Sequence, residues 1–175
     1  MKPVKKILAL ILAGVMALAL LTGCGKATSL DRTIAEGIAE GMAEYYKSEL
    51  AQQGNNNNIS VSYQVPELSR NIAPLFDENW ITKDSSDDDA LTDAAKETLK
   101  GILSSYISAD SAVIFRAADV TDVKTPFMEG VNLLDSPIDF VTSFDVGSIT
   151  SMKIAVTHKT VNDRTYALSV MILKK

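Results

Sequence analysis

The start of the chain is one uninterrupted apolar run, whereas the rest of it mixes apolar and polar positions at regular intervals. Residues 7–21 form 15 consecutive positions without a charge, rich in Leu, Ile and Ala. A helix that spans a bilayer needs about 20 apolar residues, so this run is short for one. Its length is typical of the hydrophobic region of a signal peptide, and Lys2, Lys5 and Lys6 supply the positive end before it. We therefore expect residues 1–23 to be a signal peptide.

Two later segments have the periodicity of amphipathic helices. The first is expected to start near Ser29 or Thr33, where residues 33–36 read as a capping box, and to run to about Gln53. Its apolar face consists of Ile34, Ile38, Met42, Tyr45 and Leu50. The second helix is expected at roughly 88–108, after an acidic loop. A short helix around 68–75 is an open alternative for the ambiguous stretch between them.

Several segments alternate apolar and polar residues with the period of a half-buried strand. They are residues 59–65, 111–120, 138–145, 150–161 and 164–173. Asn162 and Asp163 separate the last two, and they are a strong hairpin signal because both residues tolerate positive φ. Tyr166, Leu168, Val170 and Ile172 are expected to face the core. The stretch through Pro126, Gly130 and Pro137 is expected to be a loop.

The order of elements is helix, strand, helix and then four strands, which predicts a single α+β domain over residues 29–175. We expect the N-terminal helix and the second helix to cover one face of an antiparallel sheet of about four to five strands. The curved-sheet cone of cystatin/NTF2-like proteins is one such arrangement, on architecture alone.

The apolar run ends in Leu21-Thr22-Gly23-Cys24, and Cys24 is the only cysteine of the chain. This order resembles the lipobox of bacterial lipoproteins. The resemblance implies that the thiol of Cys24 receives a diacylglyceryl group, that a peptidase cuts just before it, and that a further acyl chain such as palmitate is added. Two or more acyl chains anchor a protein stably, whereas one binds only marginally. The alternative is an uncleaved membrane anchor with an ordinary thiol.

Cleavage before Cys24 would leave 152 of the 175 residues, with residues 24–28 as lipidated cysteine and short tether. Three of the 17 basic residues lie in the removed segment, so 14 remain against 22 acidic ones, a formal charge of about −8. An acidic body disfavours nucleic acid as a partner. It also offers no polybasic attraction to anionic lipid, so the acyl anchor must supply membrane attachment.

The sequence has no Gly-x-Ser-x-Gly elbow, no glycine loop of the kind that binds phosphate and no dinucleotide fingerprint, and no cofactor is expected. His158, the only histidine, lies in the middle of an expected strand, and we interpret it as a satisfied or solvent-facing residue rather than a catalytic base. A zinc site of the usual His/Cys type is not expected with one histidine and an acylated cysteine. Ser151 and Lys153 share a strand face, as a nucleophile and its base would. That spacing also arises often by chance.

The acidic loop before the second helix offers oxygen ligands for calcium. Its members are Asp84, Ser86, Asp87, Asp88 and Asp89. The EF-hand spacing fails, because position six would be Asp89 instead of Gly and position twelve Ala95 instead of Glu. Aspartates also stabilise a helix N-terminus. We therefore interpret the loop as a solvated, helix-capping segment, with a weak calcium site as the alternative.

Three residues are weak candidates for contact with a ligand or partner. Gly37 and Gly41 each cost about 1 kcal/mol in a helix relative to Ala. Their spacing favours close packing of the helix on a sheet or on a neighbouring helix, with a self-association face as the alternative. Trp80 lies in a polar segment, and we favour its folding over the edge of the core. An exposed tryptophan would instead be typical of an interface or a glycan site.

These features predict a lipid-anchored lipoprotein on the extracytoplasmic side of the bacterial cell membrane, acting as a non-enzymatic binding or interaction module. Its partner would be an unknown envelope protein or ligand. One alternative is a carboxylate-based envelope hydrolase that cleaves glycans, since two acidic residues suffice for that reaction. Another is an accessory subunit of a transport or secretion assembly, for which the paired glycines would be a docking face.

Overall fold

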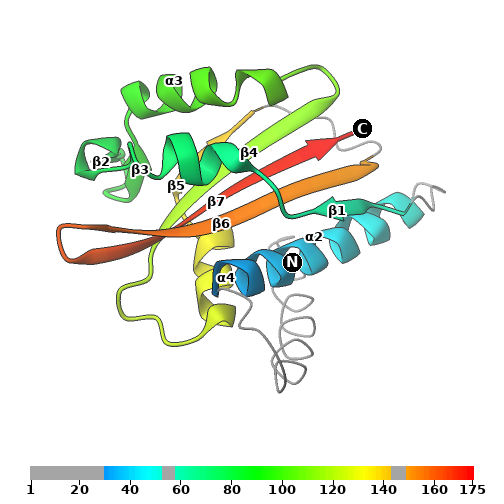
Figure 1. Ribbon diagram of the computed structural model, residues 1–175, viewed down its shortest axis with the longest axis horizontal. Coiled ribbons are helices and arrows are strands. Elements are labelled where there is room, and N and C mark those ends of the chain that lie inside the picture. Colours follow the sequence, from blue (N-terminus) through cyan, green and yellow to red (C-terminus); the bar gives the residue numbers. More distant parts are fainter. Residues whose placement is uncertain (1–29, 53–57, 143–148) are drawn as a thin grey trace.

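The central layer of the domain is a five-stranded sheet (Figure 1). The computed structural model describes residues 30–52, 58–142 and 149–175. The strands of the sheet are β1 (Ser60–Ser62), β4 (Ser111–Asp119), β5 (Ile138–Val141), β6 (Ser151–Val161) and β7 (Arg164–Lys174). Their spatial order is β1-β6-β7-β4-β5. β1 runs parallel to β6 and the other neighbours are antiparallel, so the sheet is mixed and not wholly antiparallel as expected.

The first expected helix is confirmed as α2 (Leu30–Gln52). Its apolar face meets the sheet, because Ile34, Ile38 and Met42 are buried and the helix packs against β6. The side chains of Tyr45 and Leu50, on the same expected face, lie outside the described part of the structure.

The second expected helix is shorter than its sequence pattern indicates. It forms α3 (Asp93–Ile102), followed by a single turn, η3 (Ser104–Tyr106). Thr92 caps α3, since its Oγ1 accepts a hydrogen bond from the amide of Ala95 (3.3 Å). The acidic loop therefore does not cap this helix, and that interpretation was wrong. Two short strands, β2 (Ile81–Lys83) and β3 (Asp89–Leu91), pair on either side of the loop instead.

A helix replaces the loop that we expected between β4 and β5. It is α4 (Pro126–Asp135), and the Thr125 Oγ1 at its start accepts a hydrogen bond from the amide of Met128 (3.3 Å). Proline is favoured in the first turn of a helix because its missing N–H would have no partner there. Pro126 thus starts a helix instead of interrupting one, and the expected loop was wrong.

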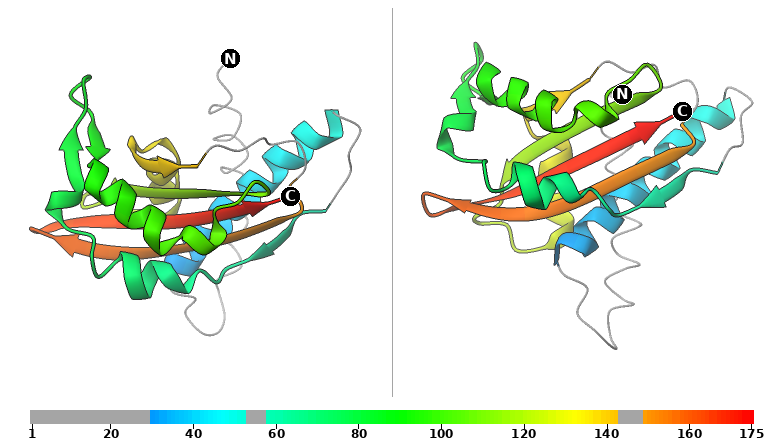
Figure 2. Two further views of the ribbon diagram at one scale, coloured as in Figure 1. Left: turned by 90° about the horizontal axis from the view of Figure 1, so that it is seen from above. Right: turned by 45° about the horizontal axis from the view of Figure 1, so that its top comes forward.

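Helices cover both faces of the sheet, not only the one that we expected (Figure 2). α2 and α4 pack on one face; α3 and the single turn η1 (Leu68–Ile72) pack on the other. β7 is buried on both sides, because successive side chains of a strand point to opposite faces. The residues of β7 on the α3 side are Tyr166, Leu168, Val170 and Ile172, which confirms the expected core face. The α+β class is also confirmed, but covering both faces gives no support to a cystatin/NTF2-like cone.

The hairpin between β6 and β7 turns where the sequence predicts. Asn162 and Asp163 have φ values of 47° and 63°, the left-handed region that asparagine and aspartate tolerate. At the other end of the domain, the strand expected at 59–65 keeps only the three residues of β1 in the sheet. None of the helices in the described part of the chain is long and apolar enough to cross a bilayer.

Candidate functional site

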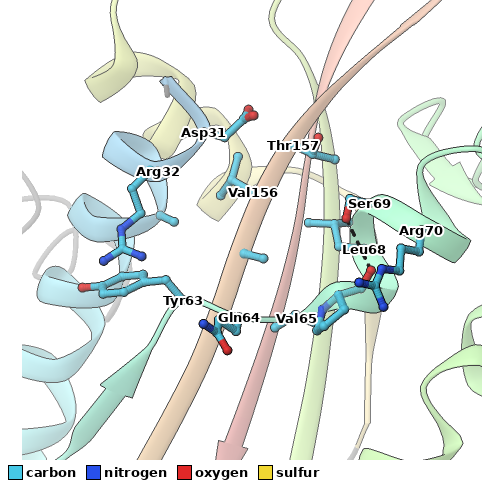
Figure 3. Close-up of a pocket in the computed structure, with 13 residues that line it drawn as sticks. Asp31, Arg32, Tyr63, Gln64, Val65, Leu68, Ser69, Arg70, Val156 and Thr157 are labelled. Atoms are coloured by element: carbon cyan, nitrogen blue, oxygen red, sulfur yellow. Dashed lines mark hydrogen bonds between the residues drawn. The ribbon is translucent and has the colours of Figure 1, made fainter. Parts of the chain in front are cut away.

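An open cleft of about 560 Å³ lies between α2, β6 and the segment that links β1 to η1 (Figure 3). Its floor is apolar and buried, and consists mainly of Ala35, Val65, Leu68 and Val156. Its rim is polar, with Arg32, Tyr63, Gln64, Ser69 and Arg70. The cleft therefore joins an apolar floor to a ring of hydrogen-bonding groups, as small-ligand sites do.

The wall formed by residues 63–70 exists because β1 leaves the sheet early. Pro66 follows β1 by four residues, and the Leu68 amide donates a hydrogen bond to the Val65 carbonyl (3.1 Å), which turns the chain. Ser69 Oγ donates to the Pro66 carbonyl (3.4 Å), as Figure 3 shows. Leu68 and Ile72 are fully buried, so their packing fixes this wall against the sheet.

Arg32 and Tyr63 close one side of the cleft. The Arg32 guanidinium lies 3.8 Å from the centroid of the Tyr63 ring, a cation–π contact that joins α2 to the segment after β1. Arg32 Nε also donates to Glu36 Oε1 (2.5 Å). Burial, and then the charge of Glu36, raise the pKa of the Tyr63 phenol. The phenol thus stays protonated and can donate a hydrogen bond.

The second guanidinium of the rim belongs to Arg70, at the end of the cleft opposite Arg32 (Figure 3). Arg70 is exposed, and it follows the turn that Ser69 stabilises. Guanidinium groups bind carboxylates and phosphates through pairs of parallel hydrogen bonds. Two of them on opposite sides of an apolar floor favour a ligand that carries negative charge.

A cluster of three ionisable side chains adjoins the cleft. His158 on β6 makes two short hydrogen bonds, from Nδ1 to Asp31 Oδ1 (2.5 Å) and from Nε2 to Glu129 Oε2 (2.6 Å). Asp31 also lines the cleft, whereas Glu129 is only 6% exposed. An imidazole donates from both nitrogens only when it is protonated. The bond to Asp31 raises the pKa of His158, burial lowers it, and the bond to Glu129 raises it further, with a net upward shift.

The cluster joins three elements instead of activating a nucleophile. Asp31 is in the first turn of α2 and Glu129 in α4, so one charged ring holds both helices to β6. With both nitrogens bound to carboxylates, His158 has no lone pair with which to accept a substrate proton. This matches our interpretation of His158 as a satisfied strand residue. Its partners were missed, although the Thr125-Pro126 start of α4 would have placed Glu129 on a helix.

The three weak contact candidates from the sequence do not meet at the cleft. Gly37 and Gly41 are buried, in the helix that packs on β6 and α4. Trp80 is 8% exposed and its ring lies 5.7 Å from that of Phe76, edge on. It therefore folds over the core, as favoured, and is not an exposed contact residue.

The conformation of the acidic loop is stabilised by hydrogen bonds and an ion pair between residues 83–89. Asp84 Oδ1 accepts hydrogen bonds from the amides of Ser86 (2.7 Å) and Asp88 (3.1 Å). Lys83 pairs with Asp89 (2.9 Å) and donates to the carbonyl of Asp87 (3.1 Å). Within the described ranges, no group of three or more His, Cys, Asp or Glu side chains is placed to hold a metal ion.

The last two candidates from the sequence are the Ser151–Lys153 pair and Cys24. Lys153 places its ammonium 5.7 Å from the centroid of the Tyr106 ring, so it faces an aromatic side chain on the α3 side of the sheet. A Ser151–Lys153 nucleophile pair gains no support from this contact. Cys24, the proposed lipidation site, lies outside the described residues, as do the signal segment and the tether.

No protein-family model, curated protein or solved structure matches this chain. These comparisons therefore indicate no ligand for the cleft. What it can bind follows from its side chains, which place two guanidiniums, a phenol and an amide around an apolar floor.

Proposed function

We propose that the protein is a bacterial lipoprotein, held to the extracytoplasmic side of the cell membrane through acylated Cys24, and that it binds an anionic ligand or partner segment in the cleft between α2, η1 and β6. The observation that carries the binding function is the placing of Arg32 and Arg70 on opposite sides of an apolar floor. The anchoring rests on the order of residues 1–24, in which a basic end, a short apolar run and Leu21-Thr22-Gly23-Cys24 follow one another.

The cleft has the dimensions of a site for a small molecule or a short peptide segment. Its volume of about 560 Å³ falls within the roughly 300–1,000 Å³ of ligand pockets. A ligand with an apolar body would cover Val65 and Leu68, while its carboxylate or phosphate would pair with a guanidinium. Gln64 and the Tyr63 phenol would add neutral hydrogen bonds at the rim. The proposed ligand is therefore an amphipathic anion.

The cleft is better suited to binding than to hydrolysis. A glycosidase needs two carboxyl groups that flank the bond to be cut, roughly 5–10 Å apart. Among the residues that the structure describes, Asp31 is the only carboxylate in the lining of the cleft, and His158 already binds it. This supports a module without enzymatic activity.

A second cavity keeps the hydrolase alternative open to experiment. It measures about 400 Å³ and lies beside the β2–β3 hairpin. Its lining includes Asp87, Asp88, Asp89, Asp119 and Asp135. Most of these side chains are exposed, whereas a general acid for glycoside hydrolysis needs apolar burial to stay protonated. If the protein releases reducing ends from purified peptidoglycan, and the double variant D119N/D135N does not, the hydrolase replaces the binding module.

The anchor is tested by the Cys24→Ser variant. The wild-type protein is expected in the detergent phase after phase separation of bacterial membranes, with a mass that exceeds the cleaved chain by its acyl chains. The variant is expected to show no added acyl mass. A wild-type protein that enters the aqueous phase, with an unmodified thiol, would contradict the anchor.

The cleft is tested by photo-crosslinking on intact bacteria. A benzophenone amino acid replaces Gln64 at the rim of the cleft, and in the matched control it replaces Thr82, an exposed residue of β2 outside the cleft. We expect an adduct from position 64 alone, and at least a fivefold loss of it when Arg32 and Arg70 are both changed to Gln. Equal adducts from both positions, or no effect of the arginine changes, would contradict a ligand in the cleft.

A further inference from the structure

Two exposed apolar side chains mark one end of the domain. Leu30 is 44% exposed and Met128 is 45% exposed. Each directly precedes a carboxylate that binds His158, since Asp31 follows Leu30 and Glu129 follows Met128. Because both carboxylates bind the same ring, the first turns of α2 and α4 lie side by side, as Figure 1 shows. We call Leu30, Met128 and the half-exposed Phe127 the apolar end.

The charges around the apolar end largely cancel one another. Asp31 and Glu129 both turn toward His158, whose positive charge cancels one of their two negative charges. The exposed Lys124 lies just before α4 and adds a positive charge on a flexible stem. Lysine side chains keep their apolar stem at an interface while the ammonium reaches lipid headgroups. The exposed Asp122, two residues before Lys124, leaves one net negative charge among these side chains, so this end is less acidic than the remainder of the chain.

The number of residues between Cys24 and α2 limits how far the apolar end can lie from the proposed anchor. Leu30 is the sixth residue after Cys24. A fully extended chain spans at most about 3.6 Å per residue, so Leu30 lies within about 22 Å of the cysteine that carries the proposed acyl chains. The first turn of α2 is thus the described part of the domain that is nearest to the proposed anchor along the chain.

We propose that the apolar end contacts the phospholipid surface, so that the domain stands with the first turns of α2 and α4 against the membrane. This inference rests on the proposed acylation of Cys24. The patch is too small to hold a protein on a bilayer, so the acyl chains anchor the domain and the apolar end orients it. The cleft, whose rim includes Asp31 and Arg32 of the same turn of α2, then opens close to the lipid headgroups.

If Cys24 is acylated, the chain has no free thiol, so an introduced cysteine is the one position that a thiol-reactive fluorophore can label. The full lipoprotein is purified from bacterial membranes with its anchor and reconstituted into vesicles of phosphatidylethanolamine and phosphatidylglycerol. Single variants Met128→Cys and Val141→Cys each carry one thiol for the fluorophore NBD, and dithionite in the buffer reduces every fluorophore that water reaches. Val141 is the matched control, because it is also exposed (52%) but ends β5, away from α2. Leu30→Cys repeats the measurement on α2.

We expect the label at position 128 to be reduced at least tenfold more slowly than that at position 141, with emission shifted to the blue. Equal rates at the two positions, with a wild-type protein that takes up no label, would overturn the orientation and leave the anchor intact. Labelling of the wild-type protein would reveal a free Cys24 and overturn the anchor as well. Protection at position 128 that persists in soluble Cys24→Ser protein and grows with its concentration would assign the apolar end to self-association and overturn the lipid contact.

Discussion

Asp31 Oδ1 lies 2.5 Å from Nδ1 of His158, although 127 residues separate them along the chain. Glu129 binds the other nitrogen of the ring at 2.6 Å. The first turn of α2, the helix α4 and the long strand β6 are therefore joined at one imidazolium. Loss of this ring would leave a carboxylate that is almost wholly buried, that of Glu129, without its partner.

Replacement of His158 by Gln is expected to lower the free energy of unfolding by about 1–3 kcal/mol, because a buried polar group that loses its partner keeps its full desolvation cost. Asp31→Asn is expected to cost less than about 1 kcal/mol, since Asp31 is more exposed than Glu129. Urea unfolding of both variants measures the difference. Lys159→Gln, at the next position of β6, is the control, and equal stability of the His158→Gln variant and this control would contradict the role of the ring.

The stability of the domain is expected to fall as the pH rises above neutrality. The pKa of His158 is raised above its ordinary 6.5 by the bonds to Asp31 and Glu129, which outweigh the opposing effect of burial. A raised pKa means that the folded state holds the proton more tightly than the unfolded state. The contribution is therefore fully present below pH 6.5 and is lost as the pH rises through the higher pKa of the folded protein.

An NMR titration measures this pKa directly, because the chain has a single histidine and its imidazole resonances need no assignment among several rings. Urea unfolding from mildly acidic to mildly alkaline pH should show the matching loss of stability, and His158→Gln should remove it. A midpoint at or below 6.5 for the folded protein would rule out the doubly bound imidazolium.

The start of α4 depends on one hydroxyl group. Thr125→Ala removes the acceptor of the Met128 amide bond and is expected to cost about 1 kcal/mol, as the loss of other helix N-caps does. Thr125→Ser keeps the acceptor and should stay near the wild-type stability. Thermal unfolding of the two variants compares them, and equal losses would show that the methyl group of Thr125, not its hydroxyl, matters.

The β6–β7 turn can be strengthened at Asp163. Its φ of 63° is left-handed, a region that glycine enters without steric cost. Asp163→Gly forms an Asn-Gly turn and is expected to stabilise the protein by a few tenths of a kcal/mol up to about 1 kcal/mol. Asp163→Val should destabilise it by about 1–2 kcal/mol, because a β-branched residue fits this region poorly. Melting temperatures that moved in the opposite directions would contradict this turn geometry.

The arginine changes used to test the cleft should leave the fold intact. Arg32→Gln removes an exposed ion pair with Glu36 and the stack on Tyr63. Exposed ion pairs contribute about 0–1 kcal/mol and exposed cation–π contacts about 0.5–1 kcal/mol, so we expect a loss of no more than about 2 kcal/mol in all. Urea unfolding checks this, and a greater loss would mean that weaker crosslinking in the cleft reflects unfolding instead of lost ligand contacts.

The α+β class was predictable because long periodic segments determine their own structure. α2 and β7 follow their apolar patterns closely, and Asn162-Asp163 marks a turn by its chemistry. The prediction of a loop at Pro126 was wrong, because proline occurs both after the end of a helix and in its first turn. Only the capping residue Thr125 directly before Pro126 indicates a helix start. The parallel pairing of β1 with β6 could not be predicted from the sequence, because it depends on contacts between residues about 90 positions apart.

The candidate site was less predictable than the fold. The cleft takes its lining from three separate segments, and nothing in the sequence near Arg32 indicates that Tyr63 and Arg70 line the same cleft. His158 could be interpreted as a satisfied strand residue, but its two carboxylates come from helices at distant positions. Local patterns specify helices and strands, whereas a cleft depends on how those elements pack.

Both edge strands of the central sheet are short, since β1 has three residues and β5 has four, and the segment from Val65 to Ile72 lies beside the stretch of β6 that β1 leaves unpaired. A sheet edge exposes unpaired backbone groups to which another chain can add a strand, and short edge strands limit that pairing. A lipid anchor would confine many copies of this chain to one plane, where they meet far more often than in free solution. If Cys24 is acylated as proposed, the short edge strands and the segment beside β6 would limit sheet-to-sheet pairing between neighbouring copies.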